Sequence, residues 1–350
     1  VSRLGELPGS TRKIVSYHNF DHTPGNLEDI FEQMLEAGAD IAKLAVRATD
    51  ICDVPPVLNL LRKHGGEVPT IAINMGEEGI ASRVLAGKFG AFLTFACETE
   101  ELAAAPGQVS VERMLDMYRF PRIDTDTEVY GVIANPVAHS MSPAIHNAAF
   151  QAVQRNAVYL PLKVNDPARF LEGFEPLGLR GLSVTIPHKE AVRELMDAVD
   201  ELSAGIGAVN TVLIHDGRRS GRNTDVAAAL AAIANAAERA GMKGLEGRKV
   251  LVVGAGGAGR AIAYGLVTRG ADVTIANRTV SRAEKLAVEL GATACSLDRM
   301  VQVSPDILVN ATSIGMWPEV DETPVPCAML RSGMVVFDSV YNPIETRLLK

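Results

Sequence analysis

Three glycines at fixed spacing, Gly254-x-Gly256-x-x-Gly259, form a pattern in this 350-residue chain that could bind a ligand. An apolar run at 250–253 comes before them, and the residues at 260–267 have the pattern of a helix. A strand, a glycine turn and a helix predict a pyrophosphate site, because glycine lets the backbone approach the anion and the helix N-terminus offers free N–H groups. The residues assigned to this turn are Gly254, Ala255, Gly256, Gly257, Ala258 and Gly259.

A second predicted strand, at 272–276, ends in Asn277-Arg278-Thr279, and Arg282 follows one helical turn later. Dinucleotide-binding folds contact the ribose about 20 residues beyond the glycine turn, which is this position. An acidic residue here would repel a 2′-phosphate, whereas a guanidinium pairs with phosphate and stacks on adenine. We therefore hypothesise that the cofactor is NADP(H); the alternative is that both arginines are ordinary surface charges.

A lysine and an aspartate could supply a proton to a substrate held near that turn. Lys189 falls in the first turn of a helix predicted to start after Pro187, where the helix dipole disfavours a cation. Asp225 leads into a predicted helix at 226–240. A carboxylate beside a lysine favours the ammonium, and such a pair can protonate a carbonyl oxygen while hydride attacks its carbon. Taken singly, each residue is more often structural.

Two serines flank a further predicted helix start. A strand begins at Val129, and Ser142-Pro143 is interpreted as an N-cap followed by proline at the first helical position. Ser140 lies two residues earlier. Two hydroxyls beside a helix N-terminus suit a polyol or a carboxylate, and capping alone would explain only Ser142.

Eight sequence blocks in order, over residues 128–350, resemble shikimate dehydrogenase. The blocks are Asn135-Pro-x-x-His-Ser140-x-Ser142-Pro, Thr185-Ile-Pro-His-Lys189, Gly207-Ala-Val-Asn210-Thr, Asn223-Thr-Asp225, Gly254-Ala-Gly-Gly-Ala-Gly259, Asn277-Arg-Thr279, Asn310-Ala-Thr-Ser-Ile-Gly-Met316 and Asp338-Ser-Val-Tyr-Asn-Pro343. The family reduces 3-dehydroshikimate to shikimate with NADPH, in the pathway to chorismate and the aromatic amino acids.

The resemblance implies a role for each matched residue. Lys189 and Asp225 become the catalytic pair, with Lys189 as the favoured proton donor. Substrate hydroxyls and carboxylate fall to Ser140, Ser142, Thr185, Asn210 and Tyr341. The nicotinamide end of the cofactor falls to the loop that contains Thr312, Ser313, Gly315 and Met316. Both serines match the shikimate version, since quinate-specific relatives tend to vary there and to prefer NAD.

The first 120 residues alternate apolar strand candidates with helical stretches. Strands are expected at 14–16, 41–46, 70–75 and 91–96, and helices near 26–37, 54–64 and 79–87, with another from Ser110. Four β/α units predict a parallel sheet equal to half of an eight-unit barrel. Polar residues are expected at the strand ends, where barrel enzymes place their chemistry.

Four of these polar residues could form a site. Lys43 lies within an apolar strand, where burial lowers the pKa of an amine and lets it attack a carbonyl. His18, expected after the first strand, could move protons beside it. Arg83 and Gln108 follow the third and fourth strand candidates. Each residue alone is more often a solvated side chain.

Together these residues resemble the C-terminal half of type I 3-dehydroquinate dehydratase. The matching blocks are Ser16-Tyr-His18-Asn-Phe20, Ala39-Asp-Ile-Ala-Lys43, Ile80-Ala-Ser-Arg83 and Ala105-Pro-Gly-Gln108. The resemblance implies a Schiff-base Lys43, an acid–base His18, a carboxylate-binding Arg83 and a site-lining Gln108. Asn19 replaces the family's aspartate, and the family's N-terminal strands are absent, so we expect little or no dehydratase activity from this chain.

The chain is therefore expected to be α/β, with a partial (β/α) barrel at 1–120, a substrate-binding domain at 128–240 and a Rossmann-type NADP-binding domain at 245–350. It resembles a dehydratase–dehydrogenase fusion shortened at both ends, without the family's last helix. Alternatives left open are a nucleotide-binding module without turnover and a quinate or related polyol dehydrogenase.

Composition narrows the partners of the chain. The net charge of −8 argues against nucleic-acid binding, and no long uncharged apolar run indicates a membrane span. Four scattered cysteines fit free thiols in a reducing cytosol and predict no metal site. We expect small-molecule substrates in the cytoplasm, and the sequence leaves open whether the chain forms a homo-oligomer.

Overall fold

The computed structural model describes residues 11–350, so the first ten residues of the predicted dehydratase segment lie outside the described part. The chain is α/β, as expected, and divides into two compact units. The first comprises residues up to 188 together with 212–219, and the second comprises 189–211 together with 220–350. The three-domain division at 1–120, 128–240 and 245–350 stays a prediction.

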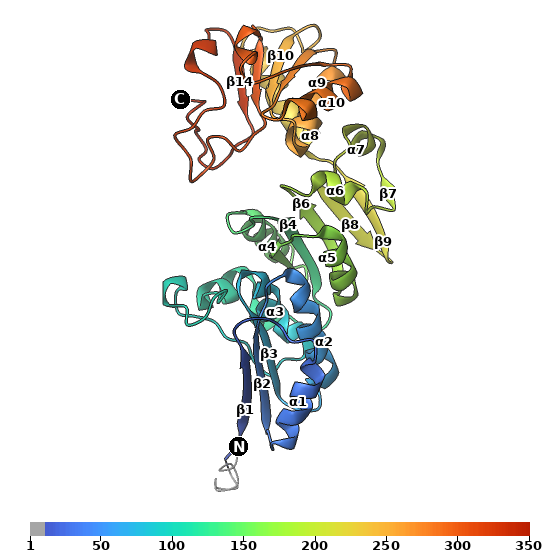
Figure 1. The fold of residues 1–350 in the computed structure, drawn as a ribbon, viewed down its shortest axis with the longest axis vertical. Helices are drawn as coiled ribbons and strands as arrows, with labels where there is room; N and C mark the ends of the chain where they lie inside the picture. Colours follow the sequence, from blue (N-terminus) through green and yellow to red (C-terminus); the bar gives the residue numbers. More distant parts are fainter. Residues whose placement is uncertain (1–10) are drawn as a thin grey trace. The chain divides into compact units, whose positions relative to one another are not determined.

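The first unit begins with a parallel sheet in the order β1-β2-β3, formed by β1 (Ile14–Asn19), β2 (Ile41–Arg47) and β3 (Thr70–Met75). Helices α1 (Leu27–Glu36) and α2 (Val54–His64) lie along one side of this sheet (Figure 1). A short α3 (Ile80–Val84) follows β3. Apolar burial explains this layering, because β3 is buried along its length and α2 buries a leucine- and valine-rich face.

Two expectations for this segment were wrong. Residues 91–96 do not form a strand: Phe92 donates to the carbonyl of Thr70, but no strand ladder follows. Phe92 and Phe95 stay 50% and 36% exposed, so the segment lacks the burial that holds a strand in a sheet. His18 lies within β1 and not after it, because pairing with β2 continues to Asn19.

The second sheet has the order β5-β4-β6-β8-β9-β7. Its first strands are β4 (Glu128–Ala134), β5 (Ala157–Lys163) and β6 (Leu179–Val184), with α4 (Ser142–Ala152) and α5 (Pro167–Phe174). Buried Asn147 fixes α4 onto β5, since its side chain donates to the carbonyl of Tyr159 (2.8 Å) and accepts from the Tyr159 N–H (2.9 Å). The remaining strands are β7 (Ala198–Val199), β8 (Thr211–His215) and β9 (Arg218–Arg222).

The second unit contains a five-stranded parallel sheet in the order β12-β11-β10-β13-β14. Its strands are β10 (Lys249–Val253), β11 (Asp272–Ala276), β12 (Thr293–Cys295), β13 (Ile307–Asn310) and β14 (Val335–Asp338). The order reverses between β10 and β13, which is the switch point where doubly wound sheets bind nucleotides. The expected Rossmann-type architecture is thus confirmed.

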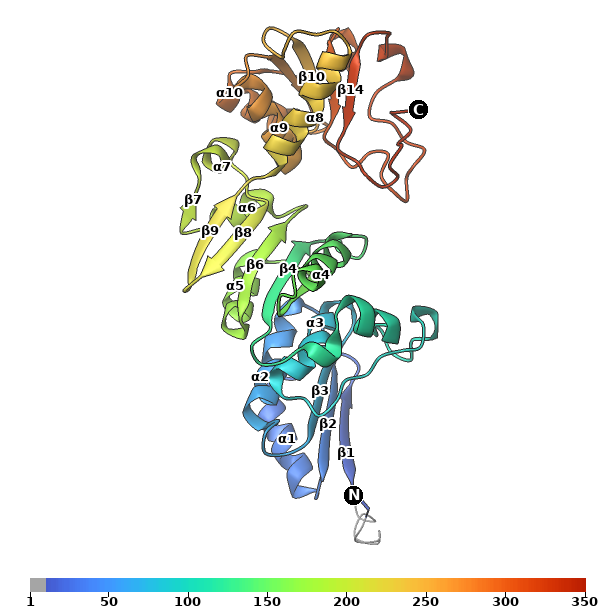
Figure 2. The same ribbon diagram turned by 180° about the vertical axis from the view of Figure 1, so that it is seen from behind.

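Helices of the second unit position the candidate site. They are α6 (Lys189–Arg193), α7 (Glu201–Ile206), α8 (Asp225–Arg239), α9 (Gly257–Val267) and α10 (Val280–Leu290). Residues of α8 and α9 share one apolar core with the sheet, and Figure 2 shows the two helices together. Helix α9 starts three residues before the expected Arg260, so Gly257 and Gly259 belong to the helix itself.

Membrane-spanning helices and metal sites can be examined in residues 11–350. None of the helices in this part is both long and apolar enough to cross a membrane. All four cysteines are free, and no group of histidine, cysteine, aspartate and glutamate side chains within residues 11–350 has an arrangement that could hold a metal ion.

Candidate active site

The first residues of two helices form an ion pair in the second unit. Lys189 begins α6, Asp225 begins α8, and the Lys189 Nζ lies 2.5 Å from the Asp225 Oδ2. The lysine side chain is only 13% exposed and the aspartate 32%. Limited contact with water strengthens the attraction between the two charges, so the pair is well placed to keep an ammonium in a fixed position.

A network of asparagines holds the Asp225 carboxylate. The Asn210 side chain donates to the other aspartate oxygen, Oδ1, at 2.7 Å and to the Thr224 hydroxyl at 2.9 Å. Asn223 accepts from the Asp225 N–H (3.0 Å) and donates to the carbonyl of Ala208 (3.0 Å). Each carboxylate oxygen therefore has its own partner, which leaves the aspartate little freedom to rotate away from the lysine.

The glycine turn has the shape of an anion site. Gly254 has a φ of +114°, and a Cβ there would lie 2.8 Å from the carbonyl oxygen of Ala311. A Cβ on Gly259 would lie 2.1 Å from the carbonyl oxygen of Gly254. Gly256 is the N-cap of α9 and offers no capping side chain, while the space beside it is open. The free N–H groups of this helix end therefore fit a pyrophosphate.

Gly257 brings the lysine and the glycine turn together. A Cβ built on Gly257 would lie 2.9 Å from the Lys189 Cδ and 3.0 Å from its Cβ. The lysine side chain thus crosses the first turn of α9 before it reaches Asp225. This contact places the Lys189 side chain next to the predicted cofactor site, and its role as a proton donor stays a prediction.

Replacing Gly257 with alanine is expected to reduce turnover while leaving the fold intact. The added methyl group displaces the Lys189 side chain, whereas alanine is at least as compatible as glycine with the first position of a helix. We expect a fall in kcat with a thermal midpoint equal to or above that of the wild type. Steady-state kinetics and a thermal melt check this, with Gly265→Ala as a packing control that does not touch Lys189. Unchanged kcat in Gly257→Ala would show that the contact is unimportant.

The predicted ribose end of the site has one free and one engaged arginine. Arg278 is exposed and makes no ion pair or side-chain hydrogen bond with the described residues. The Arg282 Nη2 lies 3.3 Å from the Glu190 Oε1, so this guanidinium is shared with a carboxylate next to Lys189. Asn277 accepts from the Ala255 N–H (3.2 Å) and donates to the Thr279 carbonyl (2.9 Å). It therefore links the glycine turn to the start of α10.

Asn310 organises the loop that was assigned to the nicotinamide. This fully buried side chain accepts from the N–H (3.0 Å) and hydroxyl (2.7 Å) of Thr312, and donates to Asp338 (2.9 Å). Gly315 closes the loop with a φ of +89°, a conformation that glycine adopts easily. The remaining loop residues of the prediction, Ser313 and Met316, are joined by a backbone hydrogen bond of 3.1 Å.

The two predicted serines lie at the start of α4 in the first unit. Ser142 is the first helical residue and not the N-cap, because Met141 already has helical backbone angles and takes that position. The Ser142 N–H donates instead to the Ser140 hydroxyl oxygen at 3.3 Å. This bond holds the Ser140 hydroxyl at the start of α4, beside Ser142.

A buried tyrosine behind these serines was not foreseen. The Tyr159 hydroxyl donates to the Ser183 Oγ at 2.6 Å, and the His146 ring stacks on it with centroids 4.3 Å apart. Burial raises the pKa of Tyr159, although hydrogen bonds with Ser183 and Ser142 oppose the shift. The tyrosine thereby connects the start of α4 with β6. Its position in an apolar strand was the only signal in the sequence.

Two other predicted substrate residues are not brought together with these groups by any described contact. Thr185 follows β6 in the first unit, with its backbone N–H bonded to the carbonyl of Ile133. Tyr341 follows β14 in the second unit and is 63% exposed.

Two of the residues assigned to the dehydratase segment lie close together. His18 on β1 and Lys43 on β2 share one face of the sheet, since Ser16 is paired with Lys43. Burial lowers the pKa of His18, and the nearby Lys43 charge lowers it further. The Lys43 Nζ also lies 4.9 Å from the centre of the Phe95 ring. The lowered pKa favours the neutral form of the histidine beside the amine, which suits an acid–base partner.

The other two dehydratase residues, Arg83 and Gln108, make no described contact with Lys43. Arg83 is 1% exposed, and none of its three guanidinium nitrogens has a hydrogen-bond partner among the described residues. Burial lowers its pKa to about 10. Gln108 turns its side-chain oxygen onto the N–H groups of Ala104 (2.7 Å) and Ala105 (3.3 Å). A buried guanidinium without partners is a ready site for an anion.

Family comparisons match three consecutive parts of the chain. Residues 2–125 match the family described as type I 3-dehydroquinase. Residues 132–212 match the shikimate dehydrogenase substrate binding domain, and residues 235–320 match the family described as shikimate / quinate 5-dehydrogenase.

Individual proteins agree with this division. The chain is 43% identical to the chloroplastic bifunctional 3-dehydroquinate dehydratase/shikimate dehydrogenase of Arabidopsis thaliana, over 99% of this chain and 60% of that protein. It is 48% identical to the NADP(+) shikimate dehydrogenase of Natronomonas pharaonis, over 64% of this chain and 83% of that protein. The crystal structure of Thermus thermophilus shikimate 5-dehydrogenase in complex with NADP(H) and shikimate is 35% identical with a TM-score of 0.53, over 64% of this chain and 82% of that one.

Proposed function

The chain belongs to the shikimate dehydrogenase family, and on this premise we propose that it reduces 3-dehydroshikimate to shikimate with NADPH. This step belongs to the pathway that leads to chorismate and the aromatic amino acids. The observation that carries the proposal is the Lys189–Asp225 pair, 2.5 Å apart and packed against Gly257 of the glycine turn.

The residues of the pair have separate tasks. Bound NADPH supplies the hydride that the substrate's keto carbon accepts. Lys189 donates a proton from Nζ to the keto oxygen, which would otherwise carry a full negative charge. Asp225 holds the Lys189 Nζ in place through the ion pair, and Asn210 keeps the carboxylate oriented. The lysine regains its proton from solvent, to which it is partly exposed.

The same family assigns the substrate's carboxylate and hydroxyl groups to a set of hydroxyl and amide side chains. These are Ser140, Ser142, Thr185, Asn210 and Tyr341. The hydrogen bond from the Ser142 N–H to the Ser140 hydroxyl, which places both serines at the start of α4, supports this assignment for the carboxylate. Asn210 donates to Thr224 and Asp225, and its side-chain oxygen accepts from the Thr211 hydroxyl (2.8 Å) and the Thr224 N–H (3.0 Å), so a substrate contact at Asn210 would have to share or replace one of these bonds.

NADP(H) is the cofactor that the residues around α9 and α10 fit. The uncapped N-terminus of α9 suits the pyrophosphate, and the free guanidinium of Arg278 suits the 2′-phosphate. Asn310 holds the loop at residues 312–316, and this loop is the proposed contact for the nicotinamide end of the cofactor.

The chain spans about 60% of the length of the bifunctional plant relative, and its first segment covers part of a type I dehydratase. We propose that Lys43 forms the Schiff base and His18 the acid–base partner of that activity in the whole protein, whose dehydratase product is the dehydrogenase's substrate. Four free cysteines favour a reducing compartment such as the cytoplasm.

NADPH oxidation with two substrates tests the proposal. We expect rapid NADPH oxidation with 3-dehydroshikimate. With 3-dehydroquinate, we expect NADPH oxidation only to the extent that this compound is first dehydrated to 3-dehydroshikimate. Lys43→Ala removes the proposed Schiff-base lysine and with it any residual dehydration, so NADPH oxidation that this variant retains with 3-dehydroquinate is expected to yield quinate. Quinate as the main product would favour the polyol dehydrogenase alternative. If the chain binds NADPH but oxidises it with neither substrate, the nucleotide-binding module without turnover would be favoured.

A further inference from the structure

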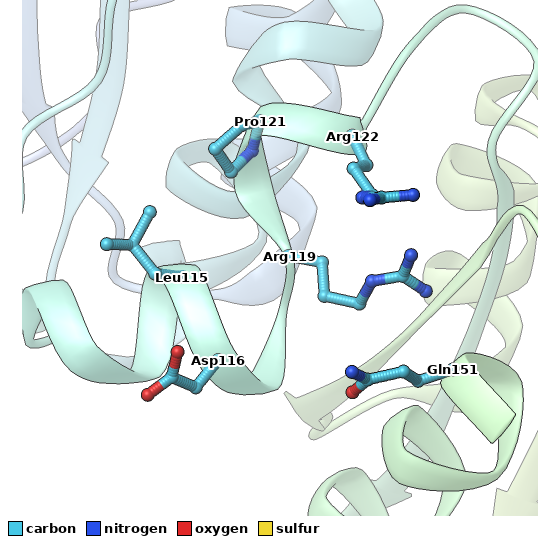
Figure 3. A pocket seen from close by; sticks show the side chains of 6 residues that line it. All are labelled: Leu115, Asp116, Arg119, Pro121, Arg122 and Gln151. Carbon is cyan, nitrogen blue, oxygen red and sulfur yellow. The ribbon is translucent and has the colours of Figure 1, made fainter.

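Two neighbouring cavities lie in the first unit, away from the residues discussed above. The first, of about 490 Å³, is lined by Leu115 and Asp116, by Arg119, Pro121 and Arg122, and by Gln151 (Figure 3). The second, of about 350 Å³, shares the two arginines and reaches Gln154. These volumes fall in the range of small-molecule sites. The cavities form where the dehydratase segment ends and the substrate-binding domain begins.

Arg119 and Arg122 point into the first cavity without a charged partner. Figure 3 shows both guanidinium groups on the same side as the Gln151 amide, with the Asp116 carboxylate directed away from them. Among the described residues, neither guanidinium forms an ion pair or a hydrogen bond to a carbonyl group. Two unpaired cations side by side repel each other, and an anion between them would relieve that repulsion.

Other charged groups nearby are already satisfied. Arg113 pairs with Glu100, and the Arg155 Nε lies 2.7 Å from the Glu128 Oε2. Asp124, which lines the second cavity, accepts from the Asn156 amide at 2.9 Å, and this bond contributes most to its lowered pKa. Arg119 and Arg122 therefore differ from Arg113 and Arg155, whose guanidinium groups are paired with carboxylates.

The backbone around the cavities is also unusual. Three non-glycine residues in the described part have a positive φ: Arg119 (53°), Gln154 (54°) and Asp216 (49°). Asp216 begins the tight β8–β9 turn, where such a conformation is normal. The other two line the cavities. Local strain that directs two polar side chains into one space is typical of binding sites.

We propose that this cavity binds a small phosphomonoester, with its phosphate between Arg119 and Arg122 and its organic part against Leu115 and Pro121. Guanidinium groups match phosphate oxygens in geometry and charge, and Gln151 can donate a further hydrogen bond. The exposed Leu115 side chain and Pro121 give the cavity an apolar side that inorganic phosphate would not use.

Calorimetric titration of the full chain with glucose 6-phosphate, inorganic phosphate and malonate tests the proposal. Three variants are compared: Arg119→Gly, Arg122→Gln and Arg218→Gln, the last an exposed arginine of β9 outside the cavities. Glycine suits the backbone of position 119, so Arg119→Gly is expected to melt at the wild-type temperature. We expect glucose 6-phosphate binding to weaken by roughly tenfold or more in the first two variants and to stay unchanged in the third.

Several results would overturn the proposal. Equal binding in all variants would place the phosphate elsewhere, for example at the glycine turn. Equal weakening that includes Arg218→Gln would indicate a general charge effect. Malonate binding as tightly as glucose 6-phosphate, with the same dependence on Arg119 and Arg122, would make the site a carboxylate site. If inorganic phosphate binds as tightly as glucose 6-phosphate, Leu115 and Pro121 do not contact the organic part of the ligand, and the proposed phosphomonoester site is wrong.

Discussion

Replacing Lys189 with methionine is expected to lower kcat for 3-dehydroshikimate reduction by roughly 10²–10⁴-fold, the usual contribution of a positioned general acid. Methionine keeps much of the side-chain length and the packing against Gly257, so the cofactor turn should hold its shape. The Asp225 carboxylate loses its cation, but it keeps the hydrogen bond from Asn210. NADPH affinity should therefore stay close to the wild-type value, and fluorescence titration measures it separately from turnover.

Two further variants make this prediction specific. Lys243→Met removes an exposed lysine far from the pair in sequence and should leave kcat unchanged. Asp225→Asn should also lower kcat, because an uncharged amide no longer holds the Lys189 Nζ by an ion pair. If the two residues act as a unit, the double variant should be no slower than Lys189→Met alone. A Lys189→Met enzyme that kept half of its activity would remove the lysine from the mechanism.

The second unit was the part of the fold that the sequence predicted best. Strand β11 matches its expected bounds, and β10 starts one residue earlier than the expected 250–253. Buried parallel strands are continuous apolar runs, so their ends are visible where polar residues or glycine begin. The strand predicted at 91–96 from a similarly apolar run was wrong, because hydrophobicity does not show whether a neighbouring strand is present to pair with it.

The sequence analysis did not predict the β8–β9 hairpin, although its turn carries a recognisable signal. Asp216-Gly217 forms its turn with φ values of 49° and 72°, and this dipeptide between two strands is a strong signal for a two-residue hairpin. The strands on either side were hard to see because β9 is Arg218–Arg222, a largely polar segment. Its pairing is decided by the turn and by backbone hydrogen bonds, and not by an apolar pattern.

The sequence pointed to the two charged residues of the candidate site, but not to the buried polar residues that hold the site in place. Lys189 and Asp225 were singled out because an ammonium at a helix start and a carboxylate in an ordered set of motifs together suggest proton transfer, although either residue alone would not. Asn223, Asn310 and Tyr159 act through partners that are distant in sequence, such as Asp338 and Ser183. Nothing in the local sequence indicates these contacts, since any buried polar residue must find a partner somewhere.

Replacing Arg278 with alanine is expected to weaken NADPH binding by roughly 10–100-fold and NADH binding by only a small factor. The range corresponds to the loss of about 1.5–3 kcal/mol for hydrogen bonds between charged groups. Arg278 is exposed and free of carboxylate partners among the described residues, so it can give its full charge to a 2′-phosphate. Dissociation constants for both cofactors, measured at low and high salt, check this, and the NADPH effect should shrink as salt screens the pair.

Arg282→Ala provides the matched comparison. Its guanidinium already lies 3.3 Å from the Glu190 carboxylate, so binding a phosphate there means giving up part of that interaction. The net loss on removing Arg282 should therefore be smaller than the loss on removing Arg278. Glu190→Gln frees Arg282 and should tighten NADPH binding slightly, without a change for NADH. Equal losses for NADPH and NADH in Arg278→Ala would mean that the arginine stacks on the adenine alone, and the preference for NADPH would then have to reside in Arg282 and Thr279.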